Sequence, residues 1–172
     1  MFKKSILIFV IYMLLYSLPA EAGFFHATSK AVARRILKEG FSIRKMNPKA
    51  RFGSGVYGSK SMATAIKEKS KAESVVSLSN SKMLQKVKID SRRLSNSQLK
   101  RMTGDRDLRG NIHKGVIGPD LGKKLGRYAS RKGKVIEYRS VRDRNTNIFI
   151  PKKVYQEHPS IVNNHKGSVI NR

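Results

Sequence analysis

The sequence predicts an α+β domain, in which one β-sheet is flanked by helices. The stretch between Ser29 and Gly40 has apolar residues at helical spacing, whereas 83–90, 134–141 and 147–150 are short runs typical of strands. The order is strand, helix, strands, helices and then a β-rich end, without the strict alternation of a parallel α/β sheet. The 150 residues that follow position 22 suit one domain with its own hydrophobic core.

The first 22 residues have the three parts of a secretory signal peptide. Two lysines at positions 3 and 4 precede an apolar run from Ile6 to about Leu15, and the small-x-small step Ala20-Glu21-Ala22 follows Pro19. Because the apolar run is short for crossing about 30 Å of hydrocarbon, we expect cleavage of segment 1–22 rather than a retained anchor. The expected product is secreted or periplasmic and has no stable membrane insertion.

The other elements follow from local signals along the chain. Thr28 or Ser29 can cap the first helix, Gly40 ends it, and Ser61 can cap the second. The expected elements are a polar loop over 42–55, helices over 62–72, 95–102 and 119–133, a loop over 103–115, and strands over 83–90, 134–141 and 147–150. The domain is expected to span 23–156, and 157–172 to be a polar, flexible tail.

The chain is strongly basic and contains no cysteine. Its 37 Lys and Arg against 11 Asp and Glu give a net charge of +26, and without segment 1–22, which holds two lysines and one glutamate, the charge is +25. An excess this large attracts polyanions, so we expect an anionic macromolecular partner, a nucleic acid or an acidic protein. The lack of cysteine excludes disulfides and thiolate ligands, and the four histidines lack the spacing of a metal site.

Two short motifs carry the chemical information. The first is His26-Ala27-Thr28 at the end of the first expected strand, followed by a helix that ends in Ile36-Leu37-Lys38-Glu39-Gly40-Phe41. The second is Phe52-Gly53-Ser54-Gly55-Val56-Tyr57, where glycines permit a close backbone approach to a ligand and a tyrosine supplies an aromatic face. Each has a simpler explanation, a histidine bonded to nearby backbone and a tight turn beside a core tyrosine. Their occurrence together favours a binding site.

These motifs resemble the NAD-binding half of ADP-ribosyltransferases of the diphtheria-toxin and poly(ADP-ribose) polymerase type, in detail over about residues 24–66. The resemblance implies an ADP-ribosyltransferase-like split β-sheet core with flanking helices, and NAD as cosubstrate. It also implies that His26 binds the ribose of the adenosine half, that the Ala27 backbone binds the nicotinamide amide, and that Tyr57 stacks on the nicotinamide ring. The residues implied to support the pocket are Thr28, Gly53 and Ser61.

The third catalytic residue departs from the family pattern. The family commonly has a glutamate at the start of a late strand, and here Asn147 occupies that place. Asparagine can hydrogen-bond a hydroxyl group but carries no full negative charge, so single-unit transfer is expected rather than chain elongation. Glu137 and Ser140 are the alternatives, because their segment is similar to NAD-degrading toxin domains with this fold that use an Arg, a Glu and a late Ser. Both could equally lie on the solvent side of an edge strand, paired to Arg or Lys.

The expected function is that of an exported mono-ADP-ribosyltransferase-like toxin or effector, a monomer that acts in a target-cell cytosol on a protein or nucleic-acid acceptor. NAD cleavage passes through an oxocarbenium-like state, as glycoside hydrolysis does. An NAD glycohydrolase and a non-catalytic cationic binding module are the alternatives. Two groups of basic residues are candidates for the anionic contact: Arg34, Arg35, Lys38, Arg44, Lys45, Lys49 and Arg51 near the pocket, and Arg101, Arg106, Arg109, Lys114, Lys123, Lys124, Arg127, Arg131 and Lys132 further on.

Overall fold

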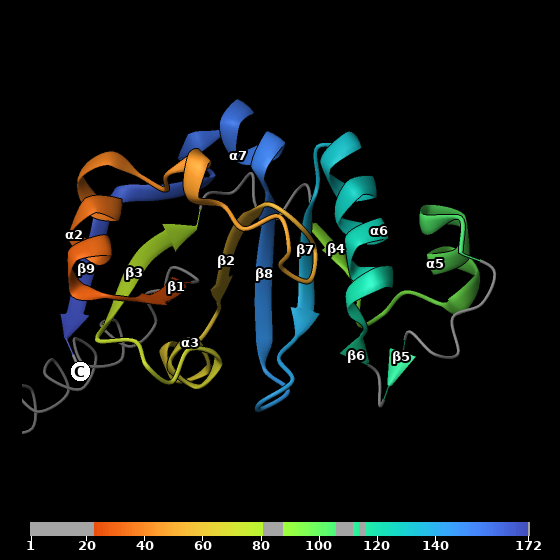
Figure 1. The fold of residues 1–172 in the computed structure, drawn as a ribbon, viewed down its shortest axis with the longest axis horizontal. Coiled ribbons are helices and arrows are strands. Elements are labelled where there is room, and N and C mark those ends of the chain that lie inside the picture. Colours follow the sequence, from red (N-terminus) through yellow and green to blue (C-terminus); the bar gives the residue numbers. More distant parts are fainter. Residues whose placement is uncertain (1–22, 81–87, 106–111, 114–115, 172) are drawn as a thin grey trace, which may run out of the picture.

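The described residues form an α+β fold around one seven-stranded mixed sheet, as the sequence predicts (Figure 1). A computed structural model of the chain describes residues 23–80, 88–105, 112–113 and 116–171. The expected signal segment, 1–22, lies outside these ranges. Within them, no helix combines the length and the hydropathy that a membrane span needs.

The sheet has the strand order β4-β7-β8-β2-β1-β3-β9. Adjacent strands are antiparallel except β4 and β7, which are parallel. The strands are β1 (Gly23–Thr28), β2 (Gly55–Ser59), β3 (Ser74–Asn80), β4 (Lys88–Asp90), β7 (Val135–Arg139), β8 (Thr146–Pro151) and β9 (Val162–Asn171), and a separate ladder pairs β5 (Ile112–His113) with β6 (Val116–Ile117).

Four of the described helices lie close to the ranges that the sequence predicts, and a fifth, Lys152–Glu157, was not expected. They are α2 (Lys30–Glu39), α3 (Met62–Glu68), α5 (Asn96–Thr103), α6 (Pro119–Arg131) and α7 (Lys152–Glu157), with 3₁₀ turns η1 (Ile43–Lys45) and η3 (Pro159–Ile161). A capping box starts α5, in which the Ser95 side chain accepts from the Gln98 N–H and the Gln98 side chain accepts from the Ser95 N–H. Ser29 and Ser61 hold the N-cap positions of α2 and α3 without a capping side-chain hydrogen bond.

The sheet divides into two parts at the β1–β2 junction. Strand β1 is paired with β3 along its whole length, and β2 is paired with β8 along its whole length. Between β1 and β2 themselves, both fully described, the register contains one pair, Phe25 with Ser59. The two parts of the sheet are therefore joined at one end of these strands and separate toward His26 and Tyr57. This separation leaves space for a cleft.

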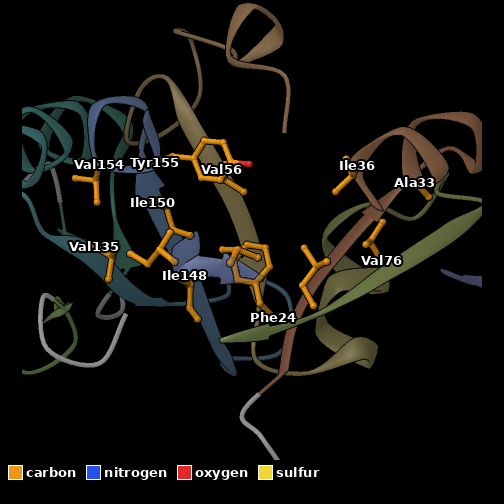
Figure 2. Close-up of a cluster of buried hydrophobic side chains, with 13 residues drawn as sticks. Phe24, Ala33, Ile36, Val56, Val76, Val135, Ile148, Ile150, Val154 and Tyr155 are labelled. Carbon is orange, nitrogen blue, oxygen red and sulfur yellow. The ribbon is translucent and has the colours of Figure 1, made fainter. Parts of the chain in front are cut away.

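Alternate residues of β8 enter two different hydrophobic cores. Ile148 and Ile150 belong to the first core, which α2 and α7 cover, and Phe149 belongs to the second, which α5 and α6 cover. Figure 2 shows Phe24 of the first core between the side chains from β8 and those from α2 and β3. The cores hold the sheet between helices and so fix the position of the β1–β2 junction.

The C-terminal segment is the main difference from the sequence-based expectation. The flexible tail expected over 157–172 is wrong, because Val162–Asn171 forms β9, the edge strand paired with β3. A polar sequence suits such an edge strand, since its backbone hydrogen bonds rather than buried side chains provide the pairing. Strand β3 was not expected either. Of the strand expected over 83–90, Lys88–Asp90 forms β4, and 81–87 lies outside the described residues.

Candidate functional site

Two adjoining hollows lie on either side of the contact between His26 and Tyr57. The first, of about 190 Å³, is bounded by α2, the segment that follows it and the start of β2; the second, of about 250 Å³, is bounded by β1, β2, α3 and β8. Both include His26 and Tyr57 among their lining residues. Each alone is smaller than the roughly 300 Å³ at which ligand pockets begin, but together they exceed it. We refer to the two hollows together as the cleft.

His26 is held in one protonation state and one tautomer. Its Nδ1 lies 2.7 Å from the backbone carbonyl oxygen of Tyr57, which can only accept a hydrogen bond, so Nδ1 carries the proton. Burial of the ring lowers the pKa of His26 from its ordinary 6.5, and the Lys69 charge adds to this effect. The imidazole is therefore neutral at pH 7, and its Nε2 has a free lone pair. Phe41 packs edge-on against the ring, with centroids 5.1 Å apart.

Tyr57 contributes a ring to the cleft while its hydroxyl group is used elsewhere. The hydroxyl accepts from the Phe52 N–H at 2.9 Å and donates to the Gly53 carbonyl at 3.0 Å, which closes the glycine turn. The ring packs against Phe149 with centroids 4.7 Å apart. Burial raises the pKa of this phenol well above its usual range, so it stays protonated. Both the tight turn and the binding-site explanation of this motif thus apply, to different atoms of one residue.

This division predicts the outcome of Tyr57→Phe. The change leaves the N–H of the buried Phe52 without a partner, so we expect the free energy of unfolding to fall by about 1–2 kcal/mol. Affinity for a ring stacked in the cleft should stay within about threefold, since the aromatic face is retained. Urea denaturation and equilibrium binding of NAD measure the two effects, and a large loss of affinity with unchanged stability would contradict the assignment.

Asn147 lies at the floor of the second hollow within a short polar chain. It is 2% exposed, accepts a hydrogen bond from the Ser59 hydroxyl, and donates through Nδ2 to Glu68 Oε1 at 2.9 Å. Glu68, at the end of α3, lines the same hollow and is otherwise exposed. A carboxylate from a neighbouring helix therefore lies within hydrogen-bond distance of the Asn147 amide. Sequence reasoning missed Glu68, because in the polar segment 67–71 it has the pattern of a solvated helix residue.

Glu137 and Ser140 do not reach the cleft. Glu137 is 4% exposed and forms ion pairs with Lys60, with Arg92 at 3.4 Å and with Lys88 at 3.9 Å. Strand β7 is an interior strand, with β4 outside it, so the expected place of Glu137 on the solvent side of an edge strand is wrong, whereas its expected pairing with Arg or Lys is confirmed. The Ser140 hydroxyl is buried and accepts from two N–H groups of the turn before β8.

Of the backbone and side-chain groups expected to bind NAD or support the pocket, some line the cleft and others do not. Ala27 lines the second hollow. Thr28 is buried, Ser61 is the N-cap of α3, and Gly53 occupies the turn with φ +91°, a left-handed value that favours glycine; none of the three lines the cleft. The structure thus brings together His26, Ala27, Tyr57 and Asn147 and adds Glu68.

The two hollows differ in charge. The first is lined by Arg35 and Lys45, with no carboxylate among its described lining residues. The second contains Glu68 and Lys69 beside the amide of Asn147. One end of the cleft is therefore suited to an anionic group, and the other to hydroxyl groups and a developing positive charge. In the described part of the chain, no three His, Asp or Glu side chains gather as a metal ion would require.

Comparison of the sequence with protein-family models and with curated proteins finds no match.

Proposed function

We propose that this chain is an exported mono-ADP-ribosyltransferase-like toxin or effector that cleaves NAD and transfers ADP-ribose to a macromolecular acceptor. The observation that supports this proposal is the convergence of His26, Tyr57 and Asn147, from three separate strands, on one cleft at the opening of the sheet. The sequence resemblance assigns NAD-binding roles to the same three positions. A shared cleft is what those roles require.

The charge and shape of the cleft fit the parts of NAD. Its first hollow, with Arg35 and Lys45, is suited to the adenosine half and the diphosphate, and Nε2 of neutral His26 can accept a hydrogen bond from a ribose hydroxyl. Its second hollow presents the Tyr57 ring to nicotinamide and the Asn147–Glu68 pair to the second ribose. A dinucleotide has two lobes, and the two hollows proposed to receive them meet at His26 and Tyr57, which line both.

The reaction breaks the bond between ribose C1′ and the nicotinamide nitrogen. Nicotinamide leaves as a neutral ring with the bonding electron pair, and the remaining positive charge spreads over C1′ and the ring oxygen. The Glu68 carboxylate stabilises this charge electrostatically, and Asn147 fixes the direction of the carboxylate. An acceptor oxygen or nitrogen then bonds to C1′ from the face opposite the leaving group and gives its proton to solvent or a nearby base.

The test is to incubate the purified protein with NAD labelled in the adenosine half and with a cell lysate. We expect nicotinamide release and label on macromolecules, and we expect His26→Ala to lower both about 100-fold or more, because it removes both the tie to Tyr57 and the ribose contact. The matched control is His158→Ala, since His158 lies at the end of α7 outside the cleft, and it should retain activity.

The other outcomes separate the alternatives. Nicotinamide release without label on macromolecules indicates an NAD glycohydrolase, in which water takes the place of the acceptor. Absence of both, together with salt-sensitive binding to polyanions, indicates a non-catalytic cationic module. Equal activity of His26→Ala and the unmodified protein would disprove the assignment of the cleft.

A further inference from the structure

A second pair of hollows lies along α6, on the other side of the glycine turn from the cleft. They have volumes of about 400 and 320 Å³ and adjoin at Arg127 and Ser130, which line both, so the two together make up one grooved surface. Phe52, Gly53 and Ser54 border this groove, whereas Gly55 and Tyr57 of the same segment border the cleft. We call this surface the α6 groove. It is separate from the dinucleotide cleft, and nothing in the proposed NAD chemistry uses it.

The α6 groove is lined by cations and, among its described lining residues, by no carboxylate. Its cations are Lys123, Lys124, Arg127, Arg131, Lys152 and Lys153. Lys124 is paired with Asp105 at 2.9 Å, and Lys153 with Glu157 at 3.7 Å. The described residues provide no ion pair for the other four. Like charges held together without counter-charges repel one another, so binding of a polyanion reduces the repulsion between the cations of the groove.

The cations of α6 have a regular spacing. Lys123, Arg127 and Arg131 are four residues apart, which places neighbouring side chains about 6 Å apart along one side of a helix. The phosphates of a nucleic-acid strand also recur regularly, about every 3.4 Å along a duplex axis and further apart in an extended strand. The side chains of acidic proteins have no such obligatory repeat. A row of cations at this spacing, along a groove, can contact several phosphates of one strand.

The surroundings of the groove argue against the other polyanions. Stable protein–protein interfaces need apolar or aromatic anchors, and binding to a lipid surface needs apolar side chains that insert. In the described part of the chain, the large hydrophobic side chains that are exposed are Val32, Met62, Val141 and Ile170, and none of them lines the groove. Phe52 and Phe149 do border it but are 3% and 1% exposed, so they are not free to stack on bases, and Met102, which also borders it, is only partly exposed.

We propose that the α6 groove binds the phosphate backbone of a nucleic-acid strand, with little dependence on base sequence. Contact is made by the ammonium and guanidinium groups of the row, and the Ser130 hydroxyl between Arg127 and Arg131 can add a hydrogen bond to a phosphate oxygen. The groove is close to the cleft but does not depend on NAD, so its binding can be measured in the absence of NAD.

The test measures binding of the purified protein to a fluorescent 20-nucleotide single-stranded RNA over a range of salt concentrations. Lys123→Glu, Arg127→Glu and Arg131→Glu together should weaken binding about 30-fold or more and reduce the slope of log K against log salt by about 2, since each lost phosphate contact removes about 0.7. The chain provides a matched control on α2, where Lys30, Arg34 and Lys38 have the same four-residue spacing but line neither groove nor cleft. Reversal of those three charges should weaken binding less than about threefold.

Equal losses in the two triple variants would show that net charge alone attracts RNA and would overturn the proposal. The same holds if the α6 variant binds RNA as the unmodified protein does. It is also overturned if that variant keeps its RNA affinity and instead loses affinity for polyglutamate or for vesicles that contain phosphatidylserine. A second α6 variant, with glutamine at the three positions, guards against misfolding, and circular dichroism of each variant checks the fold.

Discussion

Glu68→Gln is expected to lower the rate of NAD cleavage about 100-fold and to leave the affinity for NAD within a few fold. The amide keeps an oxygen that can accept from Asn147 Nδ2, now 2.9 Å from Glu68 Oε1, but removes the negative charge. In the proposed reaction that charge acts mainly on the transition state, where positive charge develops at the ribose, so kcat should fall more than KM changes. The loss corresponds to about 2.7 kcal/mol of transition-state stabilisation. Removing one group that stabilises transition-state charge typically lowers the rate about 100- to 1,000-fold. We expect the lower end of that range because Glu68 is exposed in the free protein.

The structure offers two controls for this result. Glu73→Gln removes a carboxylate outside the cleft, where Glu73 accepts from the Lys30 N–H, and should leave the rate unchanged. Glu68→Gln combined with Asn147→Asp exchanges the amide and the carboxylate between the two partners, which preserves the hydrogen bond and the total charge. We expect this double variant to recover part of the lost rate. Full activity of Glu68→Gln alone would exclude the carboxylate from the chemistry.

The cleft could be predicted in part because its two motifs are local in sequence. Segment 55–57 and the histidine of β1 have clear local signatures, and both line the cleft, whereas Gly53 lies in the turn beside it. The role that we propose for Glu68 could not be predicted in this way. It depends on α3 packing beside β1 and β2, which brings Glu68 to Asn147, 79 positions further along the chain. Exposed helix glutamates are common, so this residue has no distinguishing pattern of its own.

The fold shows the same limit. The helix α5 could be predicted because its cap, Ser95 with Gln98, is contained within four residues. Strands β3 and β9 could not, since β3 alternates little and is rich in serine, and β9 is polar along most of its length. Strand β3 forms because β1 and β9 pair with it, and β9 forms because β3 pairs with it, from Ser74 with Asn171 to Asn80 with Val162. Pairing between segments that lie so far apart leaves no local signal.

Gly126→Ala should destabilise the protein by about 3 kcal/mol, although helix propensity alone predicts a gain of about 1 kcal/mol. A Cβ at Gly126 would lie 1.9 Å from the Phe52 carbonyl oxygen, and one at Gly122 would lie 2.6 Å from the Arg51 carbonyl oxygen. Helix α6 thus rests directly on the backbone of segment 51–52, and neither side can yield without moving the other. Steric contact predicts a loss of stability and helix propensity predicts a gain, so the sign of the measured change in the free energy of unfolding decides between them.

The same contact connects stability to the cleft. The carbonyl that an alanine at position 126 would displace belongs to Phe52, whose N–H donates to the Tyr57 hydroxyl, so a shift of this segment also moves the ring that lines the cleft. We therefore expect Gly126→Ala to weaken NAD binding as well as to lower the melting temperature, by about 6–12 °C for a domain of this size. Arg127→Ala, one residue further on the exposed side of α6, should change stability by less than about 0.5 kcal/mol. A Gly126→Ala protein that melts at a higher temperature than the unmodified protein would show that α6 does not press on this segment.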